Sequence, residues 1–322
     1  MGRVTWAAGV DLGGTKIQII QVNTFGTIGE RVKIATDVTG GPDAITQQIV
    51  DAIGEMSDKI GSEPAAVGVG VAGQIDADSG VVKFAPNLKW ENVLLQQDIK
   101  RAIGVPVIVT NDVRAATWGE WLHGAGKGAK NLLCVFIGTG VGGGIVSDSK
   151  MLSGYNNTAG EIGHITVSLD GPQCTCGNKG CVEAYAGGWA LAKRAQEAVT
   201  LSPQKGKRLV DNAGGDISRI TGKMVMEAGA AGDALASQVV EQAVEAIAAG
   251  VSGLVNSISP EKIIFGGGVI EGSPYLIDKI APLIHKRTLD AAFEGVEIIR
   301  AKLHNDAGAI GAGALAIRLF VK

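Results

Sequence analysis

Three of the chain's four cysteines, Cys174, Cys176 and Cys181, lie within eight residues of one another. Thiolates are preferred zinc ligands, and a tetrahedral structural site needs a fourth ligand. His164, ten residues before Cys174, is the nearest of only four histidines. In the reducing cytoplasm, where we expect this protein, such a cluster is more typical of a metal site than of a disulfide framework. The spacing therefore predicts a closed zinc site, with a reduced cluster without metal as the alternative.

Three glycine turns follow apolar runs that read as strands. They are Asp11-Leu12-Gly13-Gly14-Thr15-Lys16, residues 138–144 (GTGVGGG) and Gly266-Gly267-Gly268. Successive backbone N–H groups in such turns can bind phosphate, because glycine leaves no side chain in the way. Thr15 and Thr139 add hydroxyl donors and Lys16 adds positive charge. Ordinary tight hairpins are the alternative, which the recurrence of the turn disfavours.

Two glycine-rich segments, residues 68–73 and residues 138–143 of the second turn, match the pattern GxGxxG. A dinucleotide-binding turn must open onto a helix, and neither segment does, since residues 74–78 read as loop. The chain also lacks a GxxxxGK[ST] motif. The sequence therefore disfavours both a Rossmann dinucleotide site and a P-loop.

Asp112 follows a predicted strand and begins a predicted helix, and α/β folds place reactive groups at the carboxyl ends of strands. Asn111 or Asp112 also fits the N-cap of that helix, so a purely capping role is the alternative. Further polar candidates, Glu161, His164 and Glu183, flank the cysteine cluster.

Alternating strand and helix patterns predict an α/β fold. Strands are expected at 4–10, 17–22, 31–36, 65–71, 106–110, 132–137, 145–146, 262–265 and 296–303, and helices at 43–60, 93–103, 112–122, 182–199, 237–257, 275–286 and 307–319. The order strand, glycine turn and strand at the start recurs near residue 132, as a duplicated phosphate-binding hairpin would leave it.

The composition is that of a globular protein, with 322 residues, of which 46% are hydrophobic and 19% charged. A net charge of −3 gives no electrostatic basis for binding nucleic acid. We expect no membrane association, because no apolar run reaches membrane-spanning length. The first residues read as a strand and not as a signal peptide, so we expect a cytoplasmic protein.

Taken together, these motifs resemble the ROK family (repressors, open reading frames and sugar kinases) of the actin-like ATPase superfamily. The resemblance runs from Val10 almost to the C-terminus. The matching segments are the phosphate loops 11–16 and 137–144, the catalytic pair Asn111-Asp112, the sugar-binding EXGH segment 159–164, the CXCGXXGCXE signature 174–183 and the adenosine-side turn 266–268.

The resemblance implies two ribonuclease-H-like domains around a central cleft. We expect a smaller domain at residues 1–120, on which the C-terminal helix 305–322 packs, and a larger one at residues 121–304 that carries the zinc loop. Members of this family are usually homodimers or homotetramers, and we expect one of these here.

The resemblance further implies ATP-dependent phosphorylation of a hexose, with Mg²⁺ at the reacting phosphates and a structural Zn²⁺. Asp112 would be the general base, and Asp11 would help to place Mg²⁺ through water. Sugar hydroxyls would be held by Asn111, Asp112, Glu161, His164 and Glu183. The nucleotide would be held by Asp11, Gly13, Gly14, Thr15, Lys16, Gly138, Thr139, Gly140, Gly267 and Gly268. Zinc would be held by His164, Cys174, Cys176 and Cys181.

Glucose is the favoured substrate, with glucose 6-phosphate as product. N-acetylmannosamine, N-acetylglucosamine, fructose and allose remain alternatives, because kinases for these sugars share the same motifs. A sugar-responsive transcription factor of the family is disfavoured by the ten residues that precede Asp11, which leave no room for a DNA-binding segment. An ATP-driven chaperone or filament protein is disfavoured by the cysteine loop and the EXGH segment.

Overall fold

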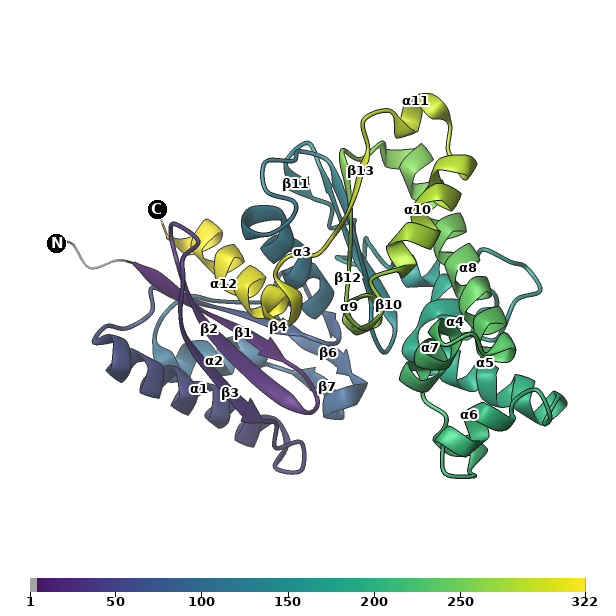
Figure 1. Ribbon diagram of the computed structural model, residues 1–322. Helices are drawn as coiled ribbons and strands as arrows, with labels where there is room; N and C mark the ends of the chain where they lie inside the picture. The colour runs from purple at the N-terminus through teal and green to yellow at the C-terminus, as the bar shows by residue number, and fades with distance from the viewer. Residues whose placement is uncertain (1–4, 322) are drawn as a thin grey trace. The chain divides into compact units, whose positions relative to one another are not determined.

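The computed structural model describes residues 5–321 of the chain. These residues form two compact units. The first comprises the described residues up to Ala129, Met151–Ala159 and the residues from Ala301 onward, and the second comprises Lys130–Lys150 and Gly160–Arg300. Both units combine a β-sheet with helices, so the predicted α/β class is confirmed (Figure 1).

The first unit is built on a five-stranded sheet in the order β3-β2-β1-β4-β8, beside a three-stranded sheet, β5-β6-β7. Its strands are β1 Trp6–Leu12, β2 Lys16–Asn23, β3 Ile28–Ala35, β4 Ala66–Val71, β5 Gln74–Ile75, β6 Val82–Ala85, β7 Trp90–Val93 and β8 Val107–Asn111. Its helices are α1 Gly41–Ile60, α2 Leu95–Ile103, α3 Asp112–His123 and α12 Ala307–Phe320, with short 3₁₀ turns at Pro86–Leu88 and His304–Asp306.

The second unit repeats the strand order of the first, with a sheet ordered β11-β10-β9-β12-β13. Its strands are β9 Leu132–Ile137, β10 Val141–Ser147, β11 Lys150–Met151, β12 Lys262–Gly266 and β13 Glu297–Arg300. Its helices are α4 Val182–Ala186, α5 Gly188–Leu201, α6 Lys207–Asn212, α7 Gly222–Ala230, α8 Ala234–Ile258, α9 Gly268–Gly272, α10 Leu276–Arg287 and α11 Asp290–Phe293, with 3₁₀ turns at Ile162–His164 and Ile217–Arg219. In both sheets an antiparallel hairpin leads into parallel strands.

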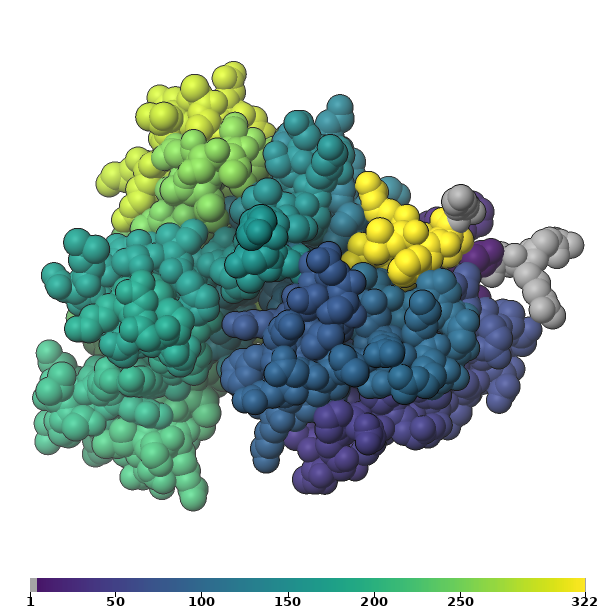
Figure 2. Space-filling view, turned by 180° about the vertical axis from the view of Figure 1, so that it is seen from behind, coloured from purple at the N-terminus to yellow at the C-terminus, as the bar shows by residue number. Residues whose placement is uncertain are grey.

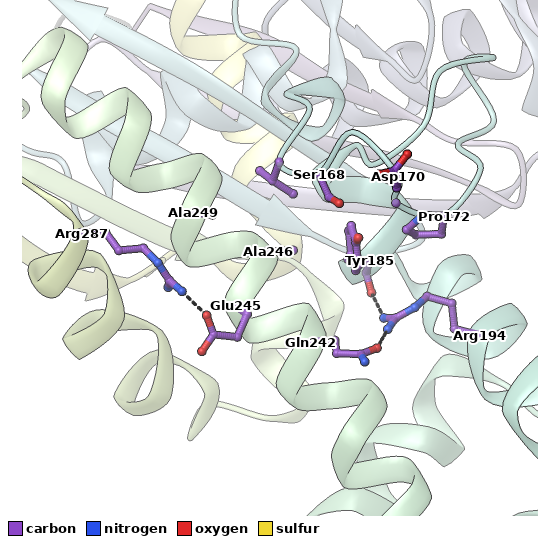
Figure 3. A pocket seen from close by; sticks show the side chains of 12 residues that line it. Ser168, Asp170, Pro172, Tyr185, Arg194, Gln242, Glu245, Ala246, Ala249 and Arg287 are labelled. Atoms are coloured by element: carbon purple, nitrogen blue, oxygen red, sulfur yellow. Dashed lines mark hydrogen bonds and ion pairs between the residues drawn. The ribbon is translucent and has the colours of Figure 1, made fainter.

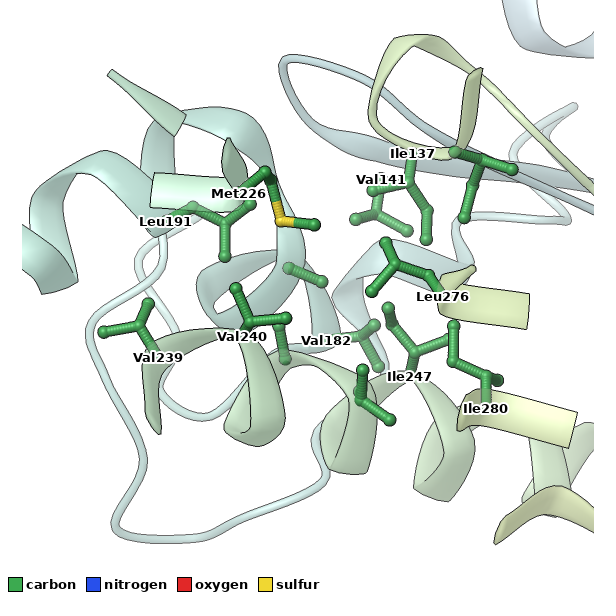
Figure 4. Close-up of a cluster of buried hydrophobic side chains, with 14 of the residues drawn as sticks. Ile137, Val141, Val182, Leu191, Met226, Val239, Val240, Ile247, Leu276 and Ile280 are labelled. Atoms are coloured by element: carbon green, nitrogen blue, oxygen red, sulfur yellow. The ribbon is translucent and has the colours of Figure 1, made fainter. Parts of the chain in front are cut away.

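Periodic apolar residues and local end signals explain the main helices. In α1, Pro42 occupies the first turn, Ile45, Ile49 and Ile53 are buried, and Gly61 ends the helix with a φ of 73°. In the second unit, α8 lies along a core of aliphatic side chains that also includes β9, α4, α5 and α10 (Figure 4). Burial of this apolar face is what stabilises such a long helix.

The C-terminal helix α12 packs on β1, β4 and α3 of the first unit. Glycine permits this close approach, because a Cβ at Gly9 would meet the carbonyl oxygen of Ala309, and one at Gly68 that of Ala312. Figure 2 shows the helix in yellow beside the blue residues of the same unit. The last helix of the chain therefore completes the unit formed by the first residues.

Several expectations about secondary structure were wrong. The single helix expected at 182–199 is two helices, α4 and α5, because the chain is extended at Gly187. The expected loop at 74–78 begins with the short strand β5, and the second glycine turn is shorter than the expected 138–144, because β10 already begins at Val141. The sequence pattern did not reveal the elements β6, β7, β11, α6, α7, α9 and α11. Among residues 5–321, none of the helices has the length and apolarity needed to span a bilayer.

Candidate functional site

Three parallel strands of the first unit bring the predicted carboxylates to one edge of the sheet. Asp11, near the end of β1, is in register with Gly70 of β4, and Gly70 with Thr110 of β8. Asp112 begins α3 directly after β8. A Cβ at Gly70 would lie 3.4 Å from the Cα of Asp112, so the absence of a side chain there leaves room at this edge.

The N-cap of α3 is Asn111 and not Asp112. The Asn111 Oδ1 accepts hydrogen bonds from the backbone N–H of Val113 (3.0 Å) and of Arg114 (3.1 Å). Its Nδ2 donates to the Gly73 carbonyl at 3.2 Å. Capping therefore explains Asn111 and does not account for the carboxylate of Asp112.

Asp11 is a partly buried residue whose carboxyl group has an unusual pKa. Burial, together with the nearby Asp112 carboxylate, raises its pKa to about 6, against the opposing effect of Lys16. Two carboxylates so placed repel each other unless a proton or a cation lies near them. Carboxylate oxygens are the ligands that Mg²⁺ prefers, so this pair fits a divalent cation.

We predict that Asp11→Asn stabilises the protein at neutral pH. The native pKa of about 6 exceeds the ordinary value of 3.8, so the native state binds the proton more tightly than the unfolded state. Stability is therefore lost as the pH rises from about 4 to about 6, and the ionised carboxylate costs about 3 kcal/mol above that range.

Calorimetric melting without Mg²⁺ or nucleotide would check this prediction. At pH 7.5 we expect Asp11→Asn to melt roughly 5 °C or more above the wild type, and this gap should shrink towards pH 4.5. An equal gap at both pH values would contradict the assigned origin of the effect. Asp51→Asn, on the exposed face of α1, is the control for loss of one charge.

The first glycine turn, residues 12–16, is fixed by backbone and hydroxyl contacts. The Gly13 N–H donates to the Lys16 carbonyl at 3.0 Å, and the Thr36 hydroxyl donates to the Gly13 carbonyl at 2.7 Å. A Cβ at Gly14 would lie 2.6 Å from the carbonyl oxygen of Asn87. The sequence pattern had not connected the Pro86–Leu88 segment with this turn.

The second glycine turn, residues 138–140, is held by Glu183 and by the start of α5. Glu183 Oε2 accepts from the Val141 N–H at 2.9 Å, and Oε1 accepts from Trp189 Nε1 at 3.3 Å. The N–H groups of Gly188 and Trp189 donate to the carbonyls of residues 138 and 139. The break between α4 and α5 therefore directs these two N–H groups towards the glycine turn.

The four predicted zinc ligands come together in the second unit. Their ligand atoms all lie within 4.8 Å of one another. Cys176 Sγ and Cys181 Sγ are 3.7 Å apart, and Cys174 Sγ is 3.7 Å from His164 Nδ1. A tetrahedron with zinc–sulfur bonds of 2.3 Å has edges of about 3.8 Å. The two separations of 3.7 Å fit neighbouring ligands of one tetrahedral zinc ion.

The chemistry of this donor set also favours a cation. Burial and hydrogen bonding to neighbouring cysteines raise the pKa of the Cys181 thiol to about 12. A thiolate at this position therefore needs a positive charge beside it. The surrounding chain is a tight hairpin, in which the Cys174 N–H donates to the Asn178 carbonyl and Gly177 has a φ of 92°.

The EXGH segment lies against β10 of the same unit. A Cβ at Gly160 would be 2.9 Å from the carbonyl oxygen of Gly143, and one at Gly163 would meet that of Val141. Glu161 between them is exposed. Small residues on both sides of Glu161 thus fix the segment to the strand and leave the carboxylate accessible.

A cavity of about 470 Å³ lies at the second and third glycine turns. It is lined by Gly138, Thr139, Gly188, Trp189, Gly222, Lys223, Met226, Glu227, Gly268, Val269, Gly272 and Ser273. Gly267, next to Gly268, has a φ of 87°, and a Cβ there would lie 2.5 Å from the Ile137 carbonyl. The α7 residues in this lining were not predicted, although Thr221 before Gly222 is an N-cap signal.

A second cavity of the same unit, about 530 Å³, contains none of the predicted site residues. Figure 3 shows its two arginines pointing at partners within the lining: Arg194 towards Gln242, and Arg287 towards Glu245. Arg194 also donates to the backbone carbonyl of Tyr185 and stacks on its ring. The cationic groups of this cavity are therefore already engaged by the protein.

The two units divide the predicted site residues between them. The first contains Asp11, Gly13, Gly14, Thr15, Lys16, Asn111 and Asp112. The second contains Gly138, Thr139, Gly140, Glu161, His164, Cys174, Cys176, Cys181, Glu183, Gly267 and Gly268. Each unit thus presents a glycine turn with at least one carboxylate close to it.

Comparison with known proteins gives matches along nearly the whole chain. The ROK family model matches residues 7–319. A glucokinase of Halalkalibacterium halodurans is 38% identical over 314 residues, 96% of this chain and 94% of that protein. A ROK family glucokinase from Streptomyces griseus, solved with glucose and AMPPNP, has a TM-score of 0.80 at 34% identity, covering 97% of this chain and 99% of that one. A xylose repressor of Caldicellulosiruptor bescii is 29% identical over 312 residues, 96% of this chain and 77% of that protein.

Proposed function

Because the chain belongs to the ROK family, and because its carboxylates and glycine turns suit phosphoryl transfer, we propose that it transfers the γ-phosphoryl group of ATP to O6 of glucose. The class of enzyme, a hexose kinase, is supported by glucokinase relatives that match almost end to end. We also propose which sugar is phosphorylated, which residue is the general base and which metal ions bind.

One observation carries the assignment of Asp112 as the general base. Asn111 makes the capping hydrogen bonds of α3, and the Asp112 carboxylate is near enough to Asp11 to raise its pKa. A capping role therefore does not explain Asp112. In the proposed reaction Asp112 takes the proton of the O6 hydroxyl while that oxygen bonds to the γ-phosphorus and the bond to ADP breaks.

The other residues bind and orient the two substrates. We assign the sugar hydroxyls to Asn111, Glu161, His164 and Glu183. The phosphates are assigned to the backbone of the glycine turns and to Thr15, Lys16 and Thr139. The cavity of about 470 Å³ is large enough for the adenosine.

Two metal ions complete the proposal. Asp11 would hold Mg²⁺ through water, and when bound this ion neutralises charge on the phosphates. Zinc would be held by three thiolates and His164 Nδ1, which leaves His164 Nε2 to meet a sugar hydroxyl. The Thr175 hydroxyl, within the cysteine loop, lies 3.5 Å from Glu183 Oε1, so the loop also supports a second proposed sugar ligand.

A coupled assay of ADP release with Mg·ATP would test the substrate. We expect kcat/KM to be highest for glucose in a panel with fructose, allose, N-acetylglucosamine and N-acetylmannosamine. A preference for an N-acetylated sugar would overturn the choice of glucose and retain the kinase. Sugar binding without turnover would instead favour a regulatory role. This role is the second candidate, because the chain is similar to a xylose repressor.

A further inference from the structure

Arg114 is an almost buried arginine on α3, two residues after Asp112, with 8% of its surface exposed. Its guanidinium donates to three acceptors on one distant loop. Nη2 reaches the carbonyl oxygens of Ala159 (3.1 Å) and Ser153 (3.4 Å), and Nη1 reaches Oδ1 of Asn157. One side chain thus holds both ends and the middle of residues 153–159.

Residues 153–159 belong to a short segment of the first unit that lies, in sequence, between two segments of the second unit. Residues Lys130–Lys150 and Gly160–Arg300 belong to the second unit, whereas Met151–Ala159 belong to the first. The loop is closed by a hydrogen bond from the Ala159 N–H to the Ser153 carbonyl at 3.0 Å. Asn157, in the left-handed region with a φ of 61°, donates to the Ile75 carbonyl at 3.4 Å.

Residues 153–159 end just before Glu161, which we propose to be a sugar ligand. Ala159 is two residues before Glu161, and Gly160 between them lies against β10. The position of Ala159 therefore restricts where the backbone of Glu161 can lie. Since α3 also begins with Asp112, Arg114 connects the helix of the proposed base with the approach to a proposed sugar ligand.

We propose that Arg114 is a positioning residue for sugar binding, an inference that rests on the proposed function. Arginine suits the task, because its planar group offers five donors in a fixed fork, whereas lysine offers a single ammonium. Without this side chain the carbonyls of Ser153 and Ala159 lose a donor, which loosens the loop. A displaced Glu161 carboxylate would form a weaker hydrogen bond with the sugar in the ground state and the transition state alike, which raises KM and leaves kcat unchanged.

Arg114→Met tests the inference, because it keeps an apolar stem of similar length and removes every donor. We expect the Kd and KM for glucose to rise ~10- to 100-fold, while kcat and the KM for ATP stay within about 3-fold. Hydrogen exchange of residues 153–160 should be faster than in the wild type. The glucose Kd of Arg114→Lys should lie between those of the wild type and Arg114→Met. Arg101→Met, on the exposed face of α2, is the matched control.

A rise in glucose Kd with faster exchange of the loop would support the proposal. Unchanged glucose Kd and KM in folded Arg114→Met would overturn it, even if the melting temperature fell, since support of the fold alone predicts that pattern. A wild type that binds glucose without phosphorylating it would overturn the proposed function, and the Kd and exchange data would still decide the role of Arg114. A wild type that binds no hexose would overturn both.

Discussion

Asp112→Asn should lower kcat by ~10²–10⁴-fold and leave the Kd for glucose within about 3-fold, because the amide keeps the shape of the carboxylate but cannot accept the O6 proton. The loss is expected in kcat and kcat/KM alike, as for an interaction made only in the transition state. Turnover with Mg·ATP, combined with calorimetric titration of glucose, measures the two effects separately.

The control for this substitution is Asp43→Asn, which removes an acidic side chain from the first turn of α1. Loss of a charge at a helix N-terminus costs at most about 2 kcal/mol at a partly buried position, and Asp112→Asn also removes the repulsion between Asp112 and Asp11, so both variants should remain folded. Near-normal turnover by Asp112→Asn would show that another group accepts the proton. Loss of glucose binding in the same variant would show that Asp112 acts mainly as a sugar ligand.

Cys176→Ala should reduce zinc from about one ion per chain to near none, because three ligands hold the ion far less tightly than four. We expect the KM for sugar to rise ~10- to 100-fold as His164 and Glu183 lose their support, while the KM for ATP changes little. Metal content from atomic spectrometry and the two KM values check this prediction.

The matched control is Cys134→Ala, since Cys134 is buried in β9 and lies outside the cluster. It should retain zinc and its KM for sugar. Loss of zinc from Cys176→Ala with unchanged sugar kinetics would leave the metal site in place and contradict its role in shaping the sugar site. Equal zinc content in both variants would contradict the ligand assignment itself.

Local signals in the sequence predicted the parts of the molecule that depend on neighbours along the chain. The apolar runs expected as strands before Asp11 and Gly138 correspond to β1 and β9, and the α/β class and the family are confirmed. The cysteine spacing predicted a cluster, and the three thiols and His164 do converge. In the strands and in the cysteine cluster, the residues that matter are within about twenty positions of one another, so their spacing restricts their geometry.

Features that depend on residues far apart in the chain could not be predicted from the sequence. Arg114 and its partners on the 153–159 loop are about forty positions apart, and nothing in either segment indicates that they meet. Asn111 and Asp112 were both candidates for the N-cap, and only the geometry distinguishes them. The break at Gly187 serves a glycine turn almost fifty residues earlier, so the apolar period alone predicted one continuous helix.

The most direct test of the account is to identify the product formed from glucose and Mg·ATP by two-dimensional phosphorus–proton NMR. We predict one sugar phosphate per ADP, with the phosphorus coupled to the two protons on C6. Coupling to a proton on another carbon, or release of inorganic phosphate with unmodified glucose, would contradict transfer to O6.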